Sequence, residues 1–398
     1  MLHAMLEYSY ENVSFYHRKF RNANVKPDDI KKTEDLTKIP TTTKKELQST
    51  PLNEILPRNV SADKCIKRKT SGSTGIPLTV ILDTRTASFR RALWSRAYVE
   101  NGLKIWDKLA TIGDPHNFPK KKWPDRLQLP RRRYISVFDD AETQLSILEQ
   151  YKPNAVRVYP SSMTMLANLC KRNRSHFKPR LIFATGETLS YENRKFIDSI
   201  FESRLLDIYA SLEFGLLAWE CRSHIGYHVN VDSVLTEYVQ NDAPVAPDER
   251  GEIICTGLVN YAMPLIRYRL GDVCIPTDEE CTCGVTLPLI KTPEGRADDF
   301  LVTVDGRLIS PMAFSPYPFE DGMEGVKQFR VIQEKRDKLT IQLALEEGFS
   351  PSHEFLENAR NEIQRLFGKE MRVEFEILDR IDLGLTGKLN TIISRVDD

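Results

Sequence analysis

Residues 70–77 combine hydroxyl side chains with two glycines, directly ahead of an apolar run. The segment reads Thr70-Ser71-Gly72-Ser73-Thr74-Gly75-Ile76-Pro77. Glycine lets the backbone approach an anion closely, and successive N–H groups together with Ser and Thr hydroxyls then supply hydrogen-bond donors to phosphate oxygens. The segment therefore predicts a phosphate-binding loop. A plain Ser/Gly surface turn is the alternative, because short motifs often match by chance.

The order of hydroxyls and glycines differs from that of a Walker loop, in which a Lys-Ser/Thr pair follows the last glycine. It resembles the ATP loop of the adenylate-forming superfamily, which includes acyl-CoA synthetases, peptide-synthetase adenylation domains and luciferases. In that superfamily four further motifs follow the loop, and all four have counterparts here in the same order: Tyr209-Ala210-Ser211-Leu212-Glu213, Arg267-Tyr268-Arg269-Leu270-Gly271-Asp272, Gly295-Arg296-Ala297-Asp298-Asp299 and Thr386-Gly387-Lys388. Five segments in one order argue against a chance match.

The resemblance implies a nucleotide site. Tyr209 would stack on adenine, and Thr185-Gly186-Glu187 would form the adenine-side wall. Asp272 would bind the ribose, since a carboxylate can accept hydrogen bonds from two neighbouring hydroxyls. The nucleotide contacts implied by the resemblance are Thr70, Ser71, Gly72, Ser73, Thr74, Gly75, Gly186, Glu187, Tyr209, Ala210, Ser211, Asp272 and Arg296.

The resemblance also implies which residues carry catalysis. Lys388 would meet the α-phosphate and the attacking carboxylate. Glu213 would hold Mg²⁺, and Arg296 would contact the nucleotide. Asp298 would be the hinge about which a small C-terminal domain carrying Lys388 rotates between two half-reactions.

Finer features are similar to one branch of the superfamily, the phenylacetate–CoA ligase family, which also includes synthetases that transfer AMP to a deazaflavin coenzyme. Arg267-Tyr268-Arg269 ahead of Gly271-Asp272 is the form that the ribose motif takes in that branch. Stretches at residues 8–16, 36–40 and 43–47 also resemble its N-terminal region. The resemblance implies ATP-dependent adenylation of a carboxylic acid, with an aryl-acetate-like acid as one candidate. Thioester formation with coenzyme A would follow.

Two other functions remain open at this point. The same first half-reaction could end in amide synthesis, or AMP itself could pass to a deazaflavin coenzyme. The chain could also be a nucleotide-binding protein that has lost catalysis. In favour of that reading, Leu212 stands where a Thr or Ser often binds phosphate, and Ile76 and Leu78 stand where a lysine usually follows the loop. Retention of Glu213 and Lys388 argues against it.

The seven cysteines suggest a metal site. Cys281-Thr282-Cys283-Gly284 forms a corner like that of a zinc knuckle, and Cys221 with His228 could complete a tetrahedral Cys₃His site. Members of the resembled family show the same cysteines, which implies a structural Zn²⁺. His224 competes with His228, which is preferred because it begins a strand-like stretch. Unligated thiols are the alternative. The other four cysteines are predicted to be core residues: Cys65, Cys170, Cys255 and Cys274.

Composition limits the classes of partner. The 398 residues contain 56 basic and 56 acidic side chains, so no global field favours nucleic acid or an anionic membrane. No apolar run approaches the roughly 20 residues of a membrane span, and the first residues do not read as a signal peptide. We expect a cytoplasmic protein whose partners are a small carboxylic acid and coenzyme A, and a homodimer is compatible with the sequence.

Helical and strand patterns alternate through the middle of the chain. Residues 155–159 and 181–184 predict buried strands, and residues 163–170 predict a helix between them. Parallel strands joined by helices follow from this alternation, with ligands at the carboxyl ends of the strands. From residue 326 onward, alternating strands around a helix at residues 352–367 predict a small α+β domain. The predicted fold class is α/β: a large N-terminal adenylate-forming domain of mixed sheets and helices, residues 1–297, and a C-terminal α+β lid, residues 298–398.

Overall fold

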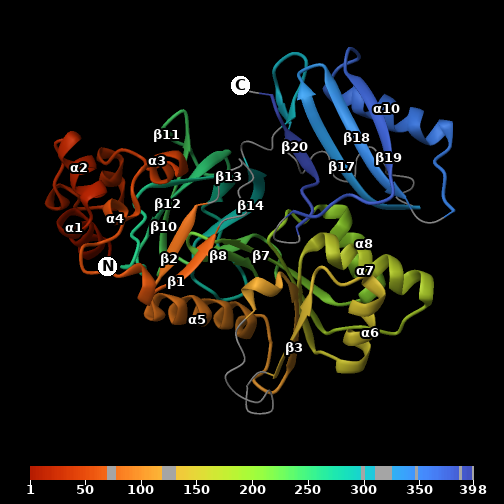
Figure 1. Cartoon of the computed structure of the whole chain (residues 1–398), viewed down its shortest axis with the longest axis horizontal. Coiled ribbons are helices and arrows are strands. Elements are labelled where there is room, and N and C mark those ends of the chain that lie inside the picture. The colour runs from red at the N-terminus through yellow and green to blue at the C-terminus, as the bar shows by residue number, and fades with distance from the viewer. Residues whose placement is uncertain are drawn as a thin grey trace. The chain divides into compact units, whose positions relative to one another are not determined.

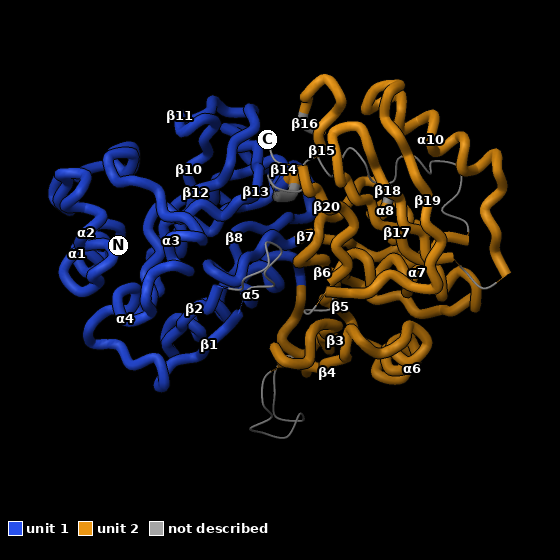
Figure 2. Tube along the Cα trace, turned by 45° about the horizontal axis from the view of Figure 1, so that its top comes forward, with its two compact units in different colours: residues 1–102, 208–293 blue, residues 103–207, 294–398 orange. Residues whose placement is uncertain are grey.

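The computed structural model describes residues 1–69, 78–118, 131–296, 301–309, 325–345, 348–384 and 388–396 (Figure 1). The chain divides into two compact units, each made of two stretches (Figure 2). Unit 1 contains residues 1–102 and 208–293, and unit 2 contains residues 103–207 and 294–398. Within the described ranges, no helix combines the length and the apolar character needed to cross a membrane. The expected domain boundary at residues 297 and 298 stays a prediction.

Unit 1 begins with short helices that pack on the rest of the unit. Tyr16 and Phe20 are fully buried, and the Tyr16 hydroxyl accepts a hydrogen bond from the Ile266 N–H at 3.0 Å. A capping box starts α3, because the Thr43 hydroxyl accepts from the Glu46 N–H at 3.1 Å and the Glu46 carboxylate accepts from the Thr43 N–H at 2.7 Å. The helices are α1 (Leu2–Asn12), α2 (Ser14–Asn22), η1 (Pro27–Asp29), η2 (Thr33–Lys38), α3 (Lys44–Ser49), α4 (Leu52–Ile55), η3 (Ala62–Lys64) and α5 (Thr84–Glu100).

Most strands of unit 1 form one ladder in the order β11-β10-β12-β13-β14-β9-β8-β7. The pairs β10–β12, β12–β13, β14–β9, β9–β8 and β8–β7 are antiparallel. A separate antiparallel hairpin joins β1 to β2, with Lys69 opposite Thr79. The strands are β1 (Ile66–Lys69), β2 (Thr79–Leu82), β7 (Arg204–Ser211), β8 (Gly215–Glu220), β9 (Tyr227–Val229), β10 (Val234–Gln240), β11 (Ala243–Pro244), β12 (Gly251–Gly257), β13 (Tyr268–Thr277) and β14 (Leu289–Arg296).

Arg267 fastens the N-terminal segment of unit 1 to the ladder. Its Nε and Nη2 atoms donate to the Glu237 carboxylate at 2.8 to 3.1 Å, and its Nη1 atom donates to the Ile39 carbonyl. The backbone adds two further bonds, from Thr42 N–H to the Arg267 carbonyl at 2.7 Å and from Arg269 N–H to the Thr42 carbonyl at 2.9 Å. The strand that carries the ribose motif is therefore held in place by chain more than 200 residues away.

The first part of unit 2 is a parallel sheet in the order β6-β5-β3-β4. Helices α6, α7 and α8 share a buried apolar core with it. The predicted strands at 155–159 and 181–184 and the helix between them are present as β5, β6 and α7, so the α/β fold class is confirmed. The elements are β3 (Lys108–Gly113), η4 (Pro115–Asn117), β4 (Arg131–Ser136), α6 (Ala141–Tyr151), β5 (Ala155–Val158), α7 (Pro160–Asn173), β6 (Leu181–Thr185) and α8 (Tyr191–Phe201).

The C-terminal part of unit 2 has a core of its own. A four-stranded sheet in the order β19-β18-β17-β20 packs its apolar face with α10, around Phe329, Ile341, Ile363 and Phe367. The predicted alternating stretches lie within β17 and β18, and the predicted helix is α10. The elements are β15 (Leu301–Val302), β16 (Leu308–Ile309), β17 (Val326–Lys335), β18 (Lys338–Leu345), α10 (His353–Phe367), β19 (Arg372–Leu378) and β20 (Ile392–Ser394).

We predict that Arg267→Met lowers the free energy of unfolding by about 3–5 kcal/mol, because it leaves the largely buried Glu237 carboxylate without its partner. Arg372→Met is the matched control. Arg372 pairs with Asp337 on the surface, where an ion pair contributes about 0–1 kcal/mol. Denaturant unfolding measures both variants, and equal losses would contradict the structural role given to Arg267.

Candidate functional site

Part of the predicted site lies outside the described residues. This holds for Thr70 to Gly75, for Asp298 and for the side chain of Arg296. The flanks of the predicted phosphate loop are described: β1 ends at Lys69, β2 begins at Thr79, and the two strands pair with each other. The roles expected for these residues stay predictions.

A tight turn between β7 and β8 carries Glu213. Ser211 closes the turn, since its hydroxyl accepts a hydrogen bond from the Phe214 N–H at 3.1 Å. The Glu213 side chain is only 9% exposed, and its carboxylate accepts from the Tyr268 hydroxyl at 3.3 Å. The turn therefore presents a nearly buried carboxylate beside strand β13, in a setting where a divalent cation could replace lost hydration.

Tyr209 and Asp272 lie in direct contact. The Tyr209 hydroxyl donates to the Asp272 carboxylate at 2.6 Å, across 63 residues of chain. Burial raises the pKa of Tyr209 well above its ordinary value, and the negative charge of Asp272 raises it further. The phenol therefore stays protonated and keeps donating. Two residues that the resemblance assigned to adenine and ribose are thus brought together in unit 1.

Arg90, on α5, binds the backbone of the turn that carries Glu213. Its guanidinium donates to the Leu212 carbonyl at 2.9 Å and to the Glu213 carbonyl. Burial lowers the pKa of Arg90 to about 10, and the charge of Glu213 opposes this shift. Gly215, with φ of +83°, leaves room for the arginine, because a Cβ there would lie 3.0 Å from Arg90 Cδ. The turn is therefore held by a buried cation.

Three other predicted residues meet in unit 2. Gly186 and Glu187 follow β6, at the carboxyl end of a parallel strand, as expected for a ligand site in such a sheet. The Lys388 side chain reaches the same place: its Nζ lies 5.8 Å from the centroid of the Tyr159 ring. The Glu187 side chain is partly buried, and its carboxylate accepts hydrogen bonds from the protein itself.

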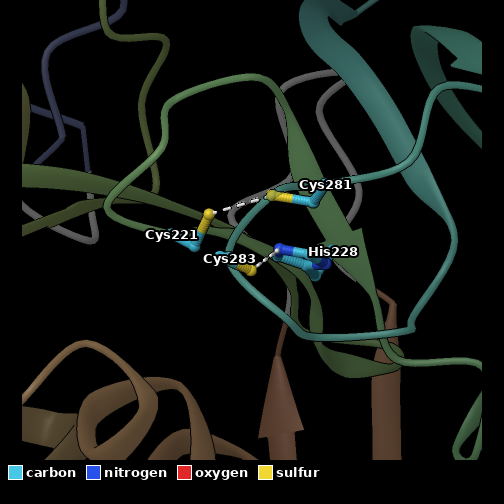
Figure 3. Close-up of side chains that lie close together, drawn as sticks. All are labelled: Cys221, His228, Cys281 and Cys283. Atoms are coloured by element: carbon cyan, nitrogen blue, oxygen red, sulfur yellow. Dashed lines mark hydrogen bonds between the residues drawn. The ribbon is translucent and has the colours of Figure 1, made fainter.

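Cys221, His228, Cys281 and Cys283 converge in unit 1 (Figure 3). Cys221 directly follows β8, His228 lies in β9, and the other two cysteines lie between β13 and β14. Their four potential ligand atoms all lie within 4.8 Å of one another. The Cys221 and Cys281 sulfurs are 3.4 Å apart, and Cys283 Sγ is 3.3 Å from His228 Nε2.

The chemistry of this cluster fits a tetrahedral metal ion. Zn–S bonds of about 2.3 Å would place two sulfur ligands about 3.8 Å apart, close to the spacing found here. Burial lowers the pKa of His228, which favours the neutral imidazole that a metal needs. Burial alone would raise the pKa of Cys281, but hydrogen bonds from Cys283 and Cys221 bring it below its ordinary value. His224 instead turns toward Glu220, at 3.7 Å.

Sequence comparison relates the chain to known ligases. Phenylacetate-coenzyme A ligase of Thermus thermophilus is 26% identical over 76% of this chain and 70% of its own length. Protein CapK of Staphylococcus aureus is 22% identical over 98% of this chain and 86% of its own length. Residues 301–395 match the family of the CapK C-terminal domain. The chain is a homologue of phenylacetate–CoA ligases and of CapK. The resemblance read from the sequence is confirmed.

Comparison with solved structures shows that the fold of this chain is similar to that of CoA ligases. The crystal structure of 2-hydroxyisobutyryl-CoA ligase with 2-HIB-AMP aligns with a TM-score of 0.76, at 20% identity, over 95% of this chain and 84% of that one. Anthranilate CoA ligase with anthranoyl-AMP aligns with a TM-score of 0.58, at 15% identity, over 81% of this chain and 65% of that one. This homologue of phenylacetate–CoA ligases therefore has the adenylate-forming fold.

Sequence reasoning missed the supporting residues of this homologue. Arg90 stands next to Arg91 in a helix rich in basic residues, where nothing in the spacing separates a buried guanidinium from an exposed one. Ser161, whose hydroxyl donates to Glu187, follows Pro160 as an ordinary first-turn residue. Gly215 gave the clearest available signal, because a glycine directly after a functional turn often marks a positive φ.

We predict that Gly215→Ala is more destabilising than Gly271→Ala. Both glycines have φ near +82°, so both substitutions carry a similar backbone strain. Only at residue 215 does the new Cβ meet Arg90, which is fixed by its bonds to Leu212 and Glu213. The extra loss should be about 1–3 kcal/mol, the usual cost of overpacking. Denaturant unfolding of the two variants tests this, and an equal loss would mean that Arg90 gives way freely.

Proposed function

We propose that the chain is an AMP-forming ligase that activates a carboxylic acid with ATP and transfers the acyl group to coenzyme A. One observation carries the proposal beyond the sequence comparisons: Tyr209 hydrogen-bonds Asp272 on strand β13, and the nearly buried carboxylate of Glu213 accepts from Tyr268 on the same strand. An aromatic face and two carboxylates, one to bind a diol and one to bind a metal, fit adenosine and a phosphate-bound Mg²⁺. A protein with only a structural task would not need this set.

In the first half-reaction the substrate carboxylate attacks the α-phosphorus of ATP. The bond between the α-phosphorus and the bridging oxygen breaks, and pyrophosphate leaves. Charge stabilisation dominates such chemistry. Lys388 would stabilise the charge on the α-phosphate, and Glu213 would hold the Mg²⁺ that neutralises phosphate charge. Hydroxyls of the loop at 70–74 would donate to the departing phosphates, and Asp272 with Arg296 would hold the ribose.

In the second half-reaction the thiol of coenzyme A attacks the acyl carbon. The thioester bond forms, AMP leaves, and the thiol proton goes to solvent. We assign the hinge to Asp298 and the domains to residues 1–297 and 298–398, so that Lys388 would withdraw while the thiol enters. A small acid is the favoured substrate class, because the related ligases act on phenylacetate and the fold neighbours carry 2-HIB-AMP and anthranoyl-AMP.

A second acceptor is the strongest competing function. The match to CapK extends over 98% of this chain, whereas the match to the Thermus ligase extends over 76%. The C-terminal part, which carries Lys388, matches the CapK family. We keep as the competing proposal a variant in which the acyl group of the adenylate passes to an amine and AMP leaves, or in which AMP passes from ATP to a coenzyme and pyrophosphate leaves.

Pyrophosphate exchange into ATP, driven by a panel of aromatic and short branched carboxylic acids, tests the proposal. At least one acid should support exchange in the wild-type protein. In the Lys388→Ala variant kcat should fall by about 100-fold or more with little change in ATP binding, because the charge acts in the transition state. Lys369→Ala, an exposed lysine of the same region, serves as the control. Unchanged exchange in Lys388→Ala would refute the role of that lysine.

We also propose that the four-residue cluster holds a structural Zn²⁺. Its support is the convergence of three thiols and one imidazole from segments about 60 residues apart. An ion bound by all four would have no open position, which is typical of structural rather than catalytic zinc. It would tie the end of β8 and strand β9 to the loop that precedes β14.

One zinc per chain is therefore expected in protein purified without added metal. Cys283→Ser should lose the metal and lower the melting temperature strongly, since structural zinc contributes many kcal/mol to a local fold. Cys65→Ser, at a partly exposed thiol far from the cluster in sequence, should retain both metal and stability. Elemental analysis and thermal unfolding measure the two effects. Wild-type protein free of zinc, with the cluster thiols titrating freely, would overturn the proposal.

A further inference from the structure

Both oxygens of the Glu187 carboxylate accept hydrogen bonds from other residues of the chain. Oε2 accepts from the Ser161 N–H at 2.9 Å, and Oε1 accepts from the Ser161 hydroxyl at 3.0 Å. Oε1 also accepts from the Leu389 N–H at 3.0 Å, across 202 residues of chain. A wall for adenine needs no carboxylate with these three bonds. The hydrogen bonds of this partly buried carboxylate instead join α7 to the segment that carries Lys388.

The third bond holds the residue directly after Lys388. The Lys388 carbonyl is fixed as well, since it accepts from the Gly384 N–H at 2.8 Å. The lysine side chain passes over Gly186, where an added Cβ would lie 3.2 Å from Lys388 Cε and 3.0 Å from Tyr159 Cε1. The side chain of Lys388 and the backbone N–H of Leu389 thus both contact the turn that follows β6.

The charge of Glu187 strengthens its hydrogen bond to the Leu389 N–H. Burial raises the pKa of Glu187, while its three hydrogen bonds and the positive charge of Lys388 act in the opposite direction. A buried carboxylate that loses a donor is costly, and hydrogen bonds to an ionised acceptor are about twice as strong as neutral ones. The two donors of Ser161 belong to the first turn of α7 and stay with Glu187. Only the Leu389 donor comes from the C-terminal part of the chain.

We propose that Glu187 is a positioning residue that docks residues 388–389, and so holds Lys388 in place for adenylate formation. This role rests on the proposed function for what Lys388 does, but the docking itself does not. Glu187 binds Ser161 and Leu389 and so acts through the backbone of the lysine segment. Because the second half-reaction does not use Lys388, docking should matter for the first half-reaction alone.

Glu187→Gln tests the docking by hydrogen exchange. The side-chain amide keeps the volume of the carboxylate but replaces one accepting oxygen with an NH₂ group and removes the charge. Exchange of the Leu389 amide, followed by mass spectrometry without substrates, should become about tenfold faster or more. Ser161→Ala is the matched control, because it removes a donor from the α7 side and leaves the bond to Leu389. Wild-type exchange at Leu389 in Glu187→Gln would overturn the proposal.

Half-reaction measurements test the consequence. In Glu187→Gln, kcat for pyrophosphate exchange should fall about tenfold with the KM for ATP unchanged, while thioester formation from supplied acyl adenylate keeps its wild-type rate. Gly186→Ala crowds the Lys388 stem and the Tyr159 ring without touching the carboxylate, and it should slow the first half-reaction more than the second, which covers the case that Glu187→Gln fails to fold. Equal loss in both half-reactions, for both variants, would overturn the positioning role.

The two proposals fail in distinguishable ways. If no acid and no acceptor supports turnover of ATP by the wild-type protein, the proposed function fails. Exchange at Leu389 still reports whether Glu187 docks the segment. If exchange accelerates but neither half-reaction changes, docking has no part in positioning Lys388, and the inference is wrong even though the ligase activity stands.

Discussion

Burying a charge is costly unless a partner is supplied, and in this protein the partner repeatedly comes from a distant segment. Arg267 meets Glu237 and the carbonyl of Ile39, which joins the N-terminal helices to the strand of the ribose motif. Arg90 meets the carbonyls of the turn that carries Glu213. Each buried ion fixes a functional strand or turn to a second element. The precision of the site therefore comes from desolvated charges as much as from apolar packing.

Local patterns were enough to predict several elements of unit 2, among them β5, α7, β6, β17, β18 and α10. Apolar runs of four or five residues ending at Pro160 or Thr185 read as buried parallel strands, and β5 and β6 occupy those positions. The strands after residue 326 followed from alternation, as β17 and β18 bear out in their burial. These signals depend on neighbours within one strand or helix, which a single sequence contains in full.

Contacts between distant segments could not be predicted from local sequence patterns in the same way. Nothing in the spacing of Glu187 indicates that its carboxylate binds the amide of Leu389, because that contact depends on how two separate stretches fold together. The Cys/His cluster was easier to predict, since the Cys281 and Cys283 pair is local and only its partners had to be inferred. The structure distinguishes the two histidines by register: β9 pairs with β14 so that His228 lies opposite Leu289, whereas His224 lies ahead of the strand.

The long separation within the Cys/His cluster also constrains biosynthesis. Cys221 leaves the ribosome about 60 residues before Cys281, an interval of roughly 3–12 s at ordinary elongation rates. During that time β10 to β13 are still being made, and the cluster is incomplete. Binding of the proposed Zn²⁺ would require the Cys221 thiol to stay reduced through this interval, before burial shields it in the finished protein.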